Sequence, residues 1–185
     1  MTDPAPYSPT PGPYERHVPV AALRAPNGTD PYTVWIWLIV AIPVVQVLPV
    51  FFIDWSAFVT ASVADPTGIA AFSMFFSPAY VALIAFGWIG LGLQIWCAYR
   101  DWRELQSRGV PQPFHWAWIF LALAVSYAVY SIGRSVVVKR RTGRGLAPMW
   151  VTIASIVASF AIGIWITVVI VQLIVDAVMM MPFGP

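Results

Sequence analysis

The stretch TVWIWLIVAIPVVQVLPVFFI, residues 33–53, decides the fold of this chain. It contains 21 residues and no charged side chain. An α-helix of that length rises about 1.5 Å per residue and so covers a bilayer hydrocarbon core about 30 Å thick. Trp35 and Trp37 near one end, and Asp54 and Trp55 at the other, are residues typical of the two membrane–water interfaces. The stretch therefore predicts a membrane-spanning helix.

The whole chain has the composition of a membrane protein. Of its 185 residues 59% are hydrophobic and only 10% are charged, and the mean hydropathy is +0.76. A soluble domain carries about 25% charged residues because its surface faces water. The net charge of +2 is too small and too scattered for a nucleic-acid partner. The single cysteine, Cys97, excludes an internal disulfide.

Three further apolar stretches extend this pattern. We predict an all-α integral membrane protein, a four-transmembrane-helix bundle over residues 33–176, with spans at about 33–53, 78–99, 114–138 and 149–175. Residues 1–32 are Pro-rich and predict a disordered tail, and residues 177–185 form a C-terminal tail. Within the connection 54–77, the stretch 68–76 is apolar but too short to span, which predicts an interfacial or re-entrant segment at 66–77.

Several residues predict local features of these helices. Pro43 and Pro49 each remove a backbone donor, so we expect a kink in the first span. Gln46 lies between them and can hydrogen-bond to a neighbouring helix. The second helix is expected to continue beyond the membrane to a C-cap at Gly109. Its apolar stripe of Ala98, Trp102 and Leu105 is expected either to face the lipid surface or to be part of a solvated helix end.

The residues needed for catalysis or metal binding do not form a recognisable pattern. His17, His115 and Cys97 lack the spacing of metal ligands, and Asp54 and Asp176 stand at the ends of predicted spans. Arg134 is the one ionisable residue near a span interior, and its side chain can extend to the interface. We therefore expect no catalytic residues, no cofactor-binding residues, no metal site and no cofactor.

Two groups of residues are candidates for other roles. The basic loop between the third and fourth spans is either a topology determinant or a site for anionic lipid headgroups, formed by Arg134, Lys139, Arg140, Arg141 and Arg144. In the fourth span small residues recur every four positions, which predicts a helix-packing seam at Ser155, Ser159 and Gly163.

The stretches YRDWREL at 99–105, PFHWAW at 113–118 and IGRSVVVKRRTGRGLAPMW at 132–150 give the chain a resemblance to small multi-pass membrane proteins of actinobacteria. The resemblance covers roughly residues 33–175. It implies a membrane location and a helical fold. No activity is assigned to that group, so it implies no residue roles.

Four spans would divide the basic residues equally between the two sides of the membrane. One side would carry Arg16, Arg24, Arg100, Arg103 and Arg108, and the other Arg134, Lys139, Arg140, Arg141 and Arg144. The first span usually dominates orientation, so we expect both termini in the cytoplasm and the protein in the plasma membrane. Two alternatives would remove the conflict: an inverted orientation, or a third segment that re-enters without crossing.

These observations favour a non-enzymatic integral membrane protein, an accessory or scaffold subunit whose basic loop contacts anionic lipid. The expected partners are membrane lipids and either a second copy of the chain or a larger membrane complex. The alternative is a small dual-topology transporter or its helper subunit, consistent with the even division of basic residues. Against a transporter of that kind, the first span lacks a carboxylate.

Overall fold

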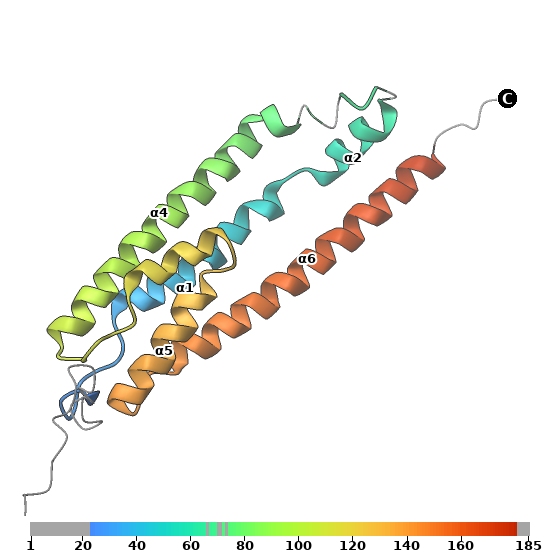
Figure 1. Cartoon of the computed structure of the whole chain (residues 1–185). Coiled ribbons are helices and arrows are strands. Elements are labelled where there is room, and N and C mark those ends of the chain that lie inside the picture. The colour runs from blue at the N-terminus through green and yellow to red at the C-terminus, as the bar shows by residue number, and fades with distance from the viewer. Residues whose placement is uncertain (1–22, 66, 70–71, 73, 181–185) are drawn as a thin grey trace, which may run out of the picture.

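The structure, a computed structural model, is all-helical over the residues that it describes: 23–65, 67–69, 72 and 74–180. Three helical segments in this part are long and apolar enough to cross a membrane: Val34–Phe52, Tyr80–Ser107 and Ala147–Met179. Figure 1 shows them lying lengthwise beside one another, with α4 running opposite to α1 and α6. The predicted Pro-rich tail falls mostly outside the described residues.

The first span is an α-helix, α1 (Val34–Val47), that continues as the 3₁₀-helix η2 (Leu48–Phe52). Thr33 caps its start, because the threonine side chain accepts a hydrogen bond from a backbone N–H in the first turn. Pro43 lies inside the α-helix, and the change of helix type comes directly before Pro49. Proline cannot donate a backbone hydrogen bond, and the helix tightens to the 3₁₀ form around Pro49, while the kink expected for this span stays a prediction.

The helix α4 (Pro78–Ser107) packs against α1 through a polar contact in the apolar part of the bundle. Nε2 of Gln46 donates to the carbonyl oxygens of Phe86, at 3.3 Å, and Gly87, at 3.1 Å. A Cβ at Gly90 would lie 2.0 Å from Nε2 of Gln46, so any larger residue there would displace the Gln46 side chain from this position. The predicted hydrogen bond from Gln46 to a neighbouring helix is therefore confirmed.

The end of α4 follows the predicted C-cap but differs in the face it buries. Gly109 has φ +77, and the N–H of Val110 bonds to the carbonyl of Leu105 at 3.0 Å, which closes the helix. Ala98 and Leu105 are fully buried inside the protein and Trp102 is half-buried. Ala98 and Leu105 therefore face neither lipid nor solvent, contrary to both expectations for this stripe. Other parts of the chain cover the end of α4.

Residues 114–138 do not form the single helix expected from their hydropathy. They are divided between a 3₁₀-helix, η4 (Trp116–Leu123), and an α-helix, α5 (Ala128–Thr142). At about 2.0 and 1.5 Å per residue, these segments are roughly 16 and 22 Å long, too short to cross the bilayer one by one. Figure 1 shows η4 rising from the end of α4 and α5 returning to the same end. The segment is a helical hairpin, as expected if the third segment re-enters the membrane without crossing it.

Local hydrogen bonds explain the turn of this hairpin. The carbonyl oxygen of Leu121 accepts from the backbone N–H groups of Ala124, Val125 and Ser126. The side-chain oxygen of Ser126 then accepts from the N–H of Ala128, the first residue of α5, at 3.1 Å. These bonds satisfy the backbone where the chain reverses, which an apolar environment requires.

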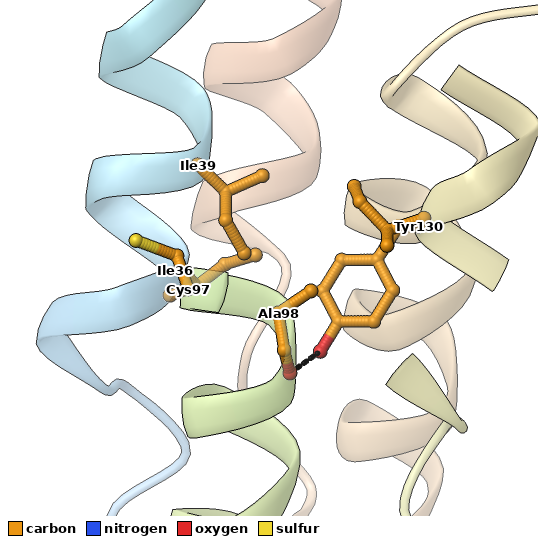
Figure 2. Packing of buried hydrophobic residues seen from close by; sticks show 6 residues of the cluster. Ile36, Ile39, Cys97, Ala98 and Tyr130 are labelled. Atoms are coloured by element: carbon orange, nitrogen blue, oxygen red, sulfur yellow. Dashed lines mark hydrogen bonds between the residues drawn. The ribbon is translucent and has the colours of Figure 1, made fainter. Parts of the chain in front are cut away.

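The hydrophobic core lies where the hairpin packs against α1 and α4. Figure 2 shows Ile36 and Ile39 of α1, Cys97 and Ala98 of α4, and Tyr130 of α5 around one small volume. All five are buried, and the Tyr130 hydroxyl oxygen lies 3.2 Å from the Ala98 carbonyl oxygen. Most buried side chains therefore belong to the half of the bundle that contains the hairpin.

The other half of the bundle is more open. The helix α6 (Ala147–Met179) contacts α5 near its start and α2 (Trp55–Ala64) farther along. Asp54 caps α2, and hydrogen bonds from the N–H of Ala57 and the hydroxyl of Ser56 lower the pKa of its carboxyl. The predicted interfacial segment 66–77 lies partly outside the described residues, and its described part includes the short helix η3 (Met74–Phe76).

The hairpin depends on a glycine between its legs. A Cβ at Gly133 would lie 2.6 Å from Cζ of the Phe114 ring, closer than carbon atoms approach in proteins. We predict that Gly133→Ala lowers the free energy of unfolding by about 1–3 kcal/mol, because the ring has to move in a packed core. Thermal unfolding in detergent measures the effect.

Gly163→Ala is the matched control, since a Cβ at Gly163 would have no atom within 4 Å and alanine favours helix. Adding Phe114→Leu to Gly133→Ala should restore part of the loss. Equal stability of Gly133→Ala and Gly163→Ala would contradict the close contact.

Candidate functional site at the basic end of the bundle

A fully buried ion pair joins α4 to the hairpin. Asp101 of α4 and Arg134 of α5 have side chains with 0% exposure. Nη2 of the arginine lies 3.0 Å from Oδ1 of the aspartate, and Nε lies 3.0 Å from Oδ2. This two-point geometry is the strongest form of a hydrogen-bonded arginine–carboxylate pair.

Two further hydroxyl groups bind the carboxylate, whereas Nη1 of Arg134 is buried without a hydrogen-bond partner among the described residues. Oδ1 of Asp101 accepts a short hydrogen bond from the hydroxyl of Thr33, and Oδ2 accepts one from Tyr130 at 2.9 Å. Nη2 of Arg134 also donates to the carbonyl oxygen of Pro31, at 2.9 Å. The site therefore ties together the segment before α1, the helix α4 and the hairpin.

The helical spacing of the flanking residues explains why these charges are buried. Asp101 lies three residues after Ala98 and four before Leu105, so it shares a helix face with two fully buried apolar residues. Arg134 stands four residues after Tyr130 and four before Val138, both fully buried. Each charge occupies the middle of a core-facing stripe.

The contacts of the pair lie within the protein. Each carboxylate oxygen of Asp101 already accepts two hydrogen bonds, so neither is left open toward a substrate or a transferred proton. Removing one member of a buried pair leaves an uncompensated charge, which makes such pairs costly to break. Asp101 and Arg134 act as a clasp that holds the hairpin against α4.

The segment before α1 lies across this end of the bundle and is held by arginines. Nη1 of Arg108 donates to the carbonyl oxygens of Asp30 and Tyr32, each at 2.9 Å. The N–H of Ala25 donates to the carbonyl of Arg141 at 3.0 Å. The described part of the N-terminal region is thus fixed to the ends of both α4 and α5.

The hairpin brings the basic residues to one end of the protein. Because α5 returns to the side on which α4 ends, one end contains all nine basic residues of the described part: Arg24, Arg100, Arg103, Arg108, Arg134, Lys139, Arg140, Arg141 and Arg144. We call it the basic end. The opposite end of the described part contains Asp54, Asp65 and Asp176. The even division expected from four spans does not apply to this fold.

The residues predicted to bind lipid headgroups have different surroundings. Arg134 is inside the clasp, so it does not belong to a headgroup site. Arg141 is half-buried and donates to the carbonyl of Leu23 at 3.4 Å. Lys139, Arg140 and Arg144 are exposed and remain open to headgroups.

The residues predicted to form a packing seam are also divided. Ser155 hydrogen-bonds to the hydroxyl of Tyr127, at 2.9 Å, and so links α6 to the hairpin. Ser159 and Gly163 are exposed and line an open groove of about 630 Å³ beside α6. We call it the α6 groove; Pro43, Val47 and Tyr127 also line it.

A second cavity of about 420 Å³ lies across the hairpin tip, between α1 and α4. Gln46 and Gln94 line it together with Ser126 and Tyr127 of the turn. Nε2 of Gln94 donates to the carbonyl of Ile39 at 3.3 Å, so both glutamines join α1 to α4. The polar groups of the bundle interior thus serve first as contacts between helices.

Comparison of the chain with protein-family profiles, with curated proteins and with solved structures finds no match. The site is therefore interpreted from its own geometry.

Sequence reasoning missed the clasp. The sequence pattern places Asp101 in a charged helix end and lets Arg134 extend to the interface, whereas both are buried in the structure. The available clue was the position of Asp101 between Ala98 and Leu105 on the apolar stripe. The partner could not be chosen, because the sequence did not show that α5 returns to the same end as α4.

We predict that Asp101→Asn lowers the free energy of unfolding by about 3–5 kcal/mol, since it leaves the Arg134 charge buried without a counter-charge. Thermal unfolding in detergent measures the change. The double variant Asp101→Asn with Arg134→Gln should be more stable than the single one, because it removes both charges.

Asp30→Asn is a matched control. Its carboxylate lies 3.7 Å from Arg108 but is 63% exposed, so its loss should cost less than about 1 kcal/mol. If Asp101→Asn and Asp30→Asn have the same stability, the clasp does not stabilise the fold.

Proposed function

We propose that this protein is a non-enzymatic accessory or scaffold subunit of a membrane complex, and that its α6 groove receives a membrane-spanning helix of another polypeptide. The observation that carries the proposal is the state of α6. The most apolar part of α6, a stretch of 18 residues, contains no residue that is buried within the chain. Small residues of the same helix line a groove.

The chemistry of the groove supports a helix as its occupant. Helices in lipid associate by close packing of their backbones, which small side chains permit. Ser159, Gly163 and Thr167 recur at four-residue intervals in the groove wall, and the hydroxyls of Ser159 and Thr167 donate to carbonyls of their own helix. The wall therefore offers close approach without a polar group that needs a partner.

The clasp supports a structural role over a catalytic or transport role. Its carboxylate and guanidinium bind each other and groups from the segment before α1 and from α5. Such a site stabilises one conformation. The dual-topology transporter is disfavoured, because that alternative needs similar basic charge at both ends of the bundle.

The orientation proposed for the protein places the basic end in the cytoplasm, where basic residues near span ends accumulate. Lys139, Arg140 and Arg144 then contact the anionic lipid surface of that leaflet. The three spans lead Met180 to the opposite side, which revises the cytoplasmic C-terminus expected from four spans.

The packing proposal predicts that Ser159→Leu and Gly163→Leu each abolish assembly while leaving the monomer folded, because the added side chain fills the groove and disturbs no packed core. Purification in mild detergent followed by mass spectrometry identifies the partner, whether a different protein or a second copy. Ala161→Leu is the control, since Ala161 is exposed on α6 outside the groove. A parent protein that purifies as a monomer without a stoichiometric partner would contradict the proposal.

The orientation proposal predicts that Ser107→Cys and Arg144→Cys are both shielded from a membrane-impermeant thiol reagent in intact cells, because both positions are at the basic end. Thr67→Cys, which is exposed at the opposite end, should react. The native Cys97 is buried and serves as the unreactive background. Reaction at position 144 but not at 107 would instead indicate four crossings.

A further inference from the structure

A pocket at the basic end combines unpaired arginines with aromatic rings. It has a volume of about 570 Å³ and lies between the start of α1 and the last turns of α4. Its wall is formed by Trp35, Tyr99, Arg100, Arg103, Glu104 and Ser107. This wall is separate from the clasp, from the α6 groove and from the exposed basic residues of α5.

The arginines of this pocket have free hydrogen-bond donors. The Arg100 guanidinium lies over the rings of Trp35, at 4.9 Å, and Trp96, at 5.7 Å. Among the described residues neither Arg100 nor Arg103 forms an ion pair. Stacking on rings orients a guanidinium without using its N–H groups.

The nearby carboxylate is already neutralised. Oε1 of Glu104 lies 2.5 Å from Nη2 of Arg108, which leaves Arg100 and Arg103 as the uncompensated charges of the pocket wall. Nη1 of Arg103 donates to the hydroxyl of Tyr99 at 3.2 Å, and the remaining donors of both arginines have no hydrogen-bond partner among the described residues. The pocket is therefore electropositive.

The depth of the pocket matches the headgroup region of a bilayer. The apolar part of α4 that begins at Tyr80 reaches Tyr99 after 20 residues, about 30 Å of helix. Arg100 then stands directly outside the hydrocarbon core, at the level where Trp and Tyr side chains collect.

An apolar track leads from the arginines toward the membrane centre. Ile89, Leu93 and Trp96 are 60%, 47% and 48% exposed, and with Arg100 they follow one another at four- and three-residue intervals on one face of α4. A phospholipid could therefore place its phosphate beside Arg100 and lay an acyl chain along this apolar track.

We propose that this pocket binds one anionic phospholipid of the cytoplasmic leaflet, with its phosphate held by the guanidinium groups of Arg100 and Arg103. Planar guanidinium groups match phosphate oxygens at two points, and the track accepts an acyl chain. The inference rests on the proposed orientation of the basic end. It differs from contact at Lys139, Arg140 and Arg144, which is diffuse surface attraction.

The test counts lipid on the full chain. The protein is purified, stripped of lipid and titrated with phosphatidylglycerol in detergent while native mass spectrometry records the first bound molecule. R100Q/R103Q should bind that molecule roughly 30-fold more weakly, taking two basic residues at the value typical of an anionic membrane surface. R100K/R103K keeps the two positive charges but removes the planar guanidinium groups. Its affinity for the first lipid should lie between those of R100Q/R103Q and the parent.

K139Q/R140Q is the matched control, since it removes two charges from the same end. It should bind the first lipid as tightly as the parent does. It should lose only the additional, diffusely attracted lipids, whose binding high salt also removes. If K139Q/R140Q loses the first lipid and R100Q/R103Q keeps it, the pocket is wrong and the basic loop is the site. Equal loss in both variants would also overturn the pocket, because it would indicate general surface attraction.

Two further titrations identify the source of the phosphate. Inorganic phosphate alone should bind far more weakly than phosphatidylglycerol, and phosphatidylcholine should compete poorly because its headgroup carries no net charge. If inorganic phosphate binds as tightly as phosphatidylglycerol, the ligand is not a lipid. If phosphatidylcholine binds as tightly, the pocket does not require an anionic headgroup. The thiol-labelling experiment tests the orientation independently. A failure of the lipid pocket can therefore be distinguished from a failure of the proposed orientation.

Discussion

Burying Asp101 beside Arg134 constrains the rest of this fold. Each charge would be costly alone in an apolar interior, so the two side chains have to meet with good geometry and with their remaining atoms largely paired. They meet at 3.0 Å only if α5 returns to the end of α4. The hairpin, the path of the segment before α1 and the position of the core between α1, α4 and α5 are all consistent with that requirement.

The return of α5 also determines the charge distribution. A straight helix over 114–138 would carry Lys139, Arg140, Arg141 and Arg144 to the far end. With the hairpin, these residues join Arg100, Arg103 and Arg108, and the described part of the chain becomes strongly asymmetric. An asymmetric distribution is what orients spans in a membrane. The same interaction that closes the core therefore bears on topology and gathers the charges available to anionic lipid.

The two halves of the bundle differ in how far they are packed. Near the basic end, α1, α4 and the hairpin bury a common core, whereas the α6 groove lies open between α6 on one side and α1 and the hairpin turn on the other. Lipid removes the hydrophobic drive that closes such gaps in soluble proteins, so close packing with another helix is what remains to fill them. The half near the basic end is held by buried contacts, and the open half is the one for which we propose a partner helix.

The sequence alone predicted the helical class and located the three helical segments that are long and apolar enough to cross a membrane, because these follow from the length and apolarity of each stretch. It also indicated the contact of Gln46 with a neighbouring helix. The sequence did not reveal the reversal at 124–127, because the hydropathy of a crossing helix is the same as that of a hairpin that turns halfway. Only the tertiary structure decided which charges are buried and which are exposed. That choice depends on which helix faces meet, and the pairing of Asp101 with Arg134 joins residues 33 positions apart.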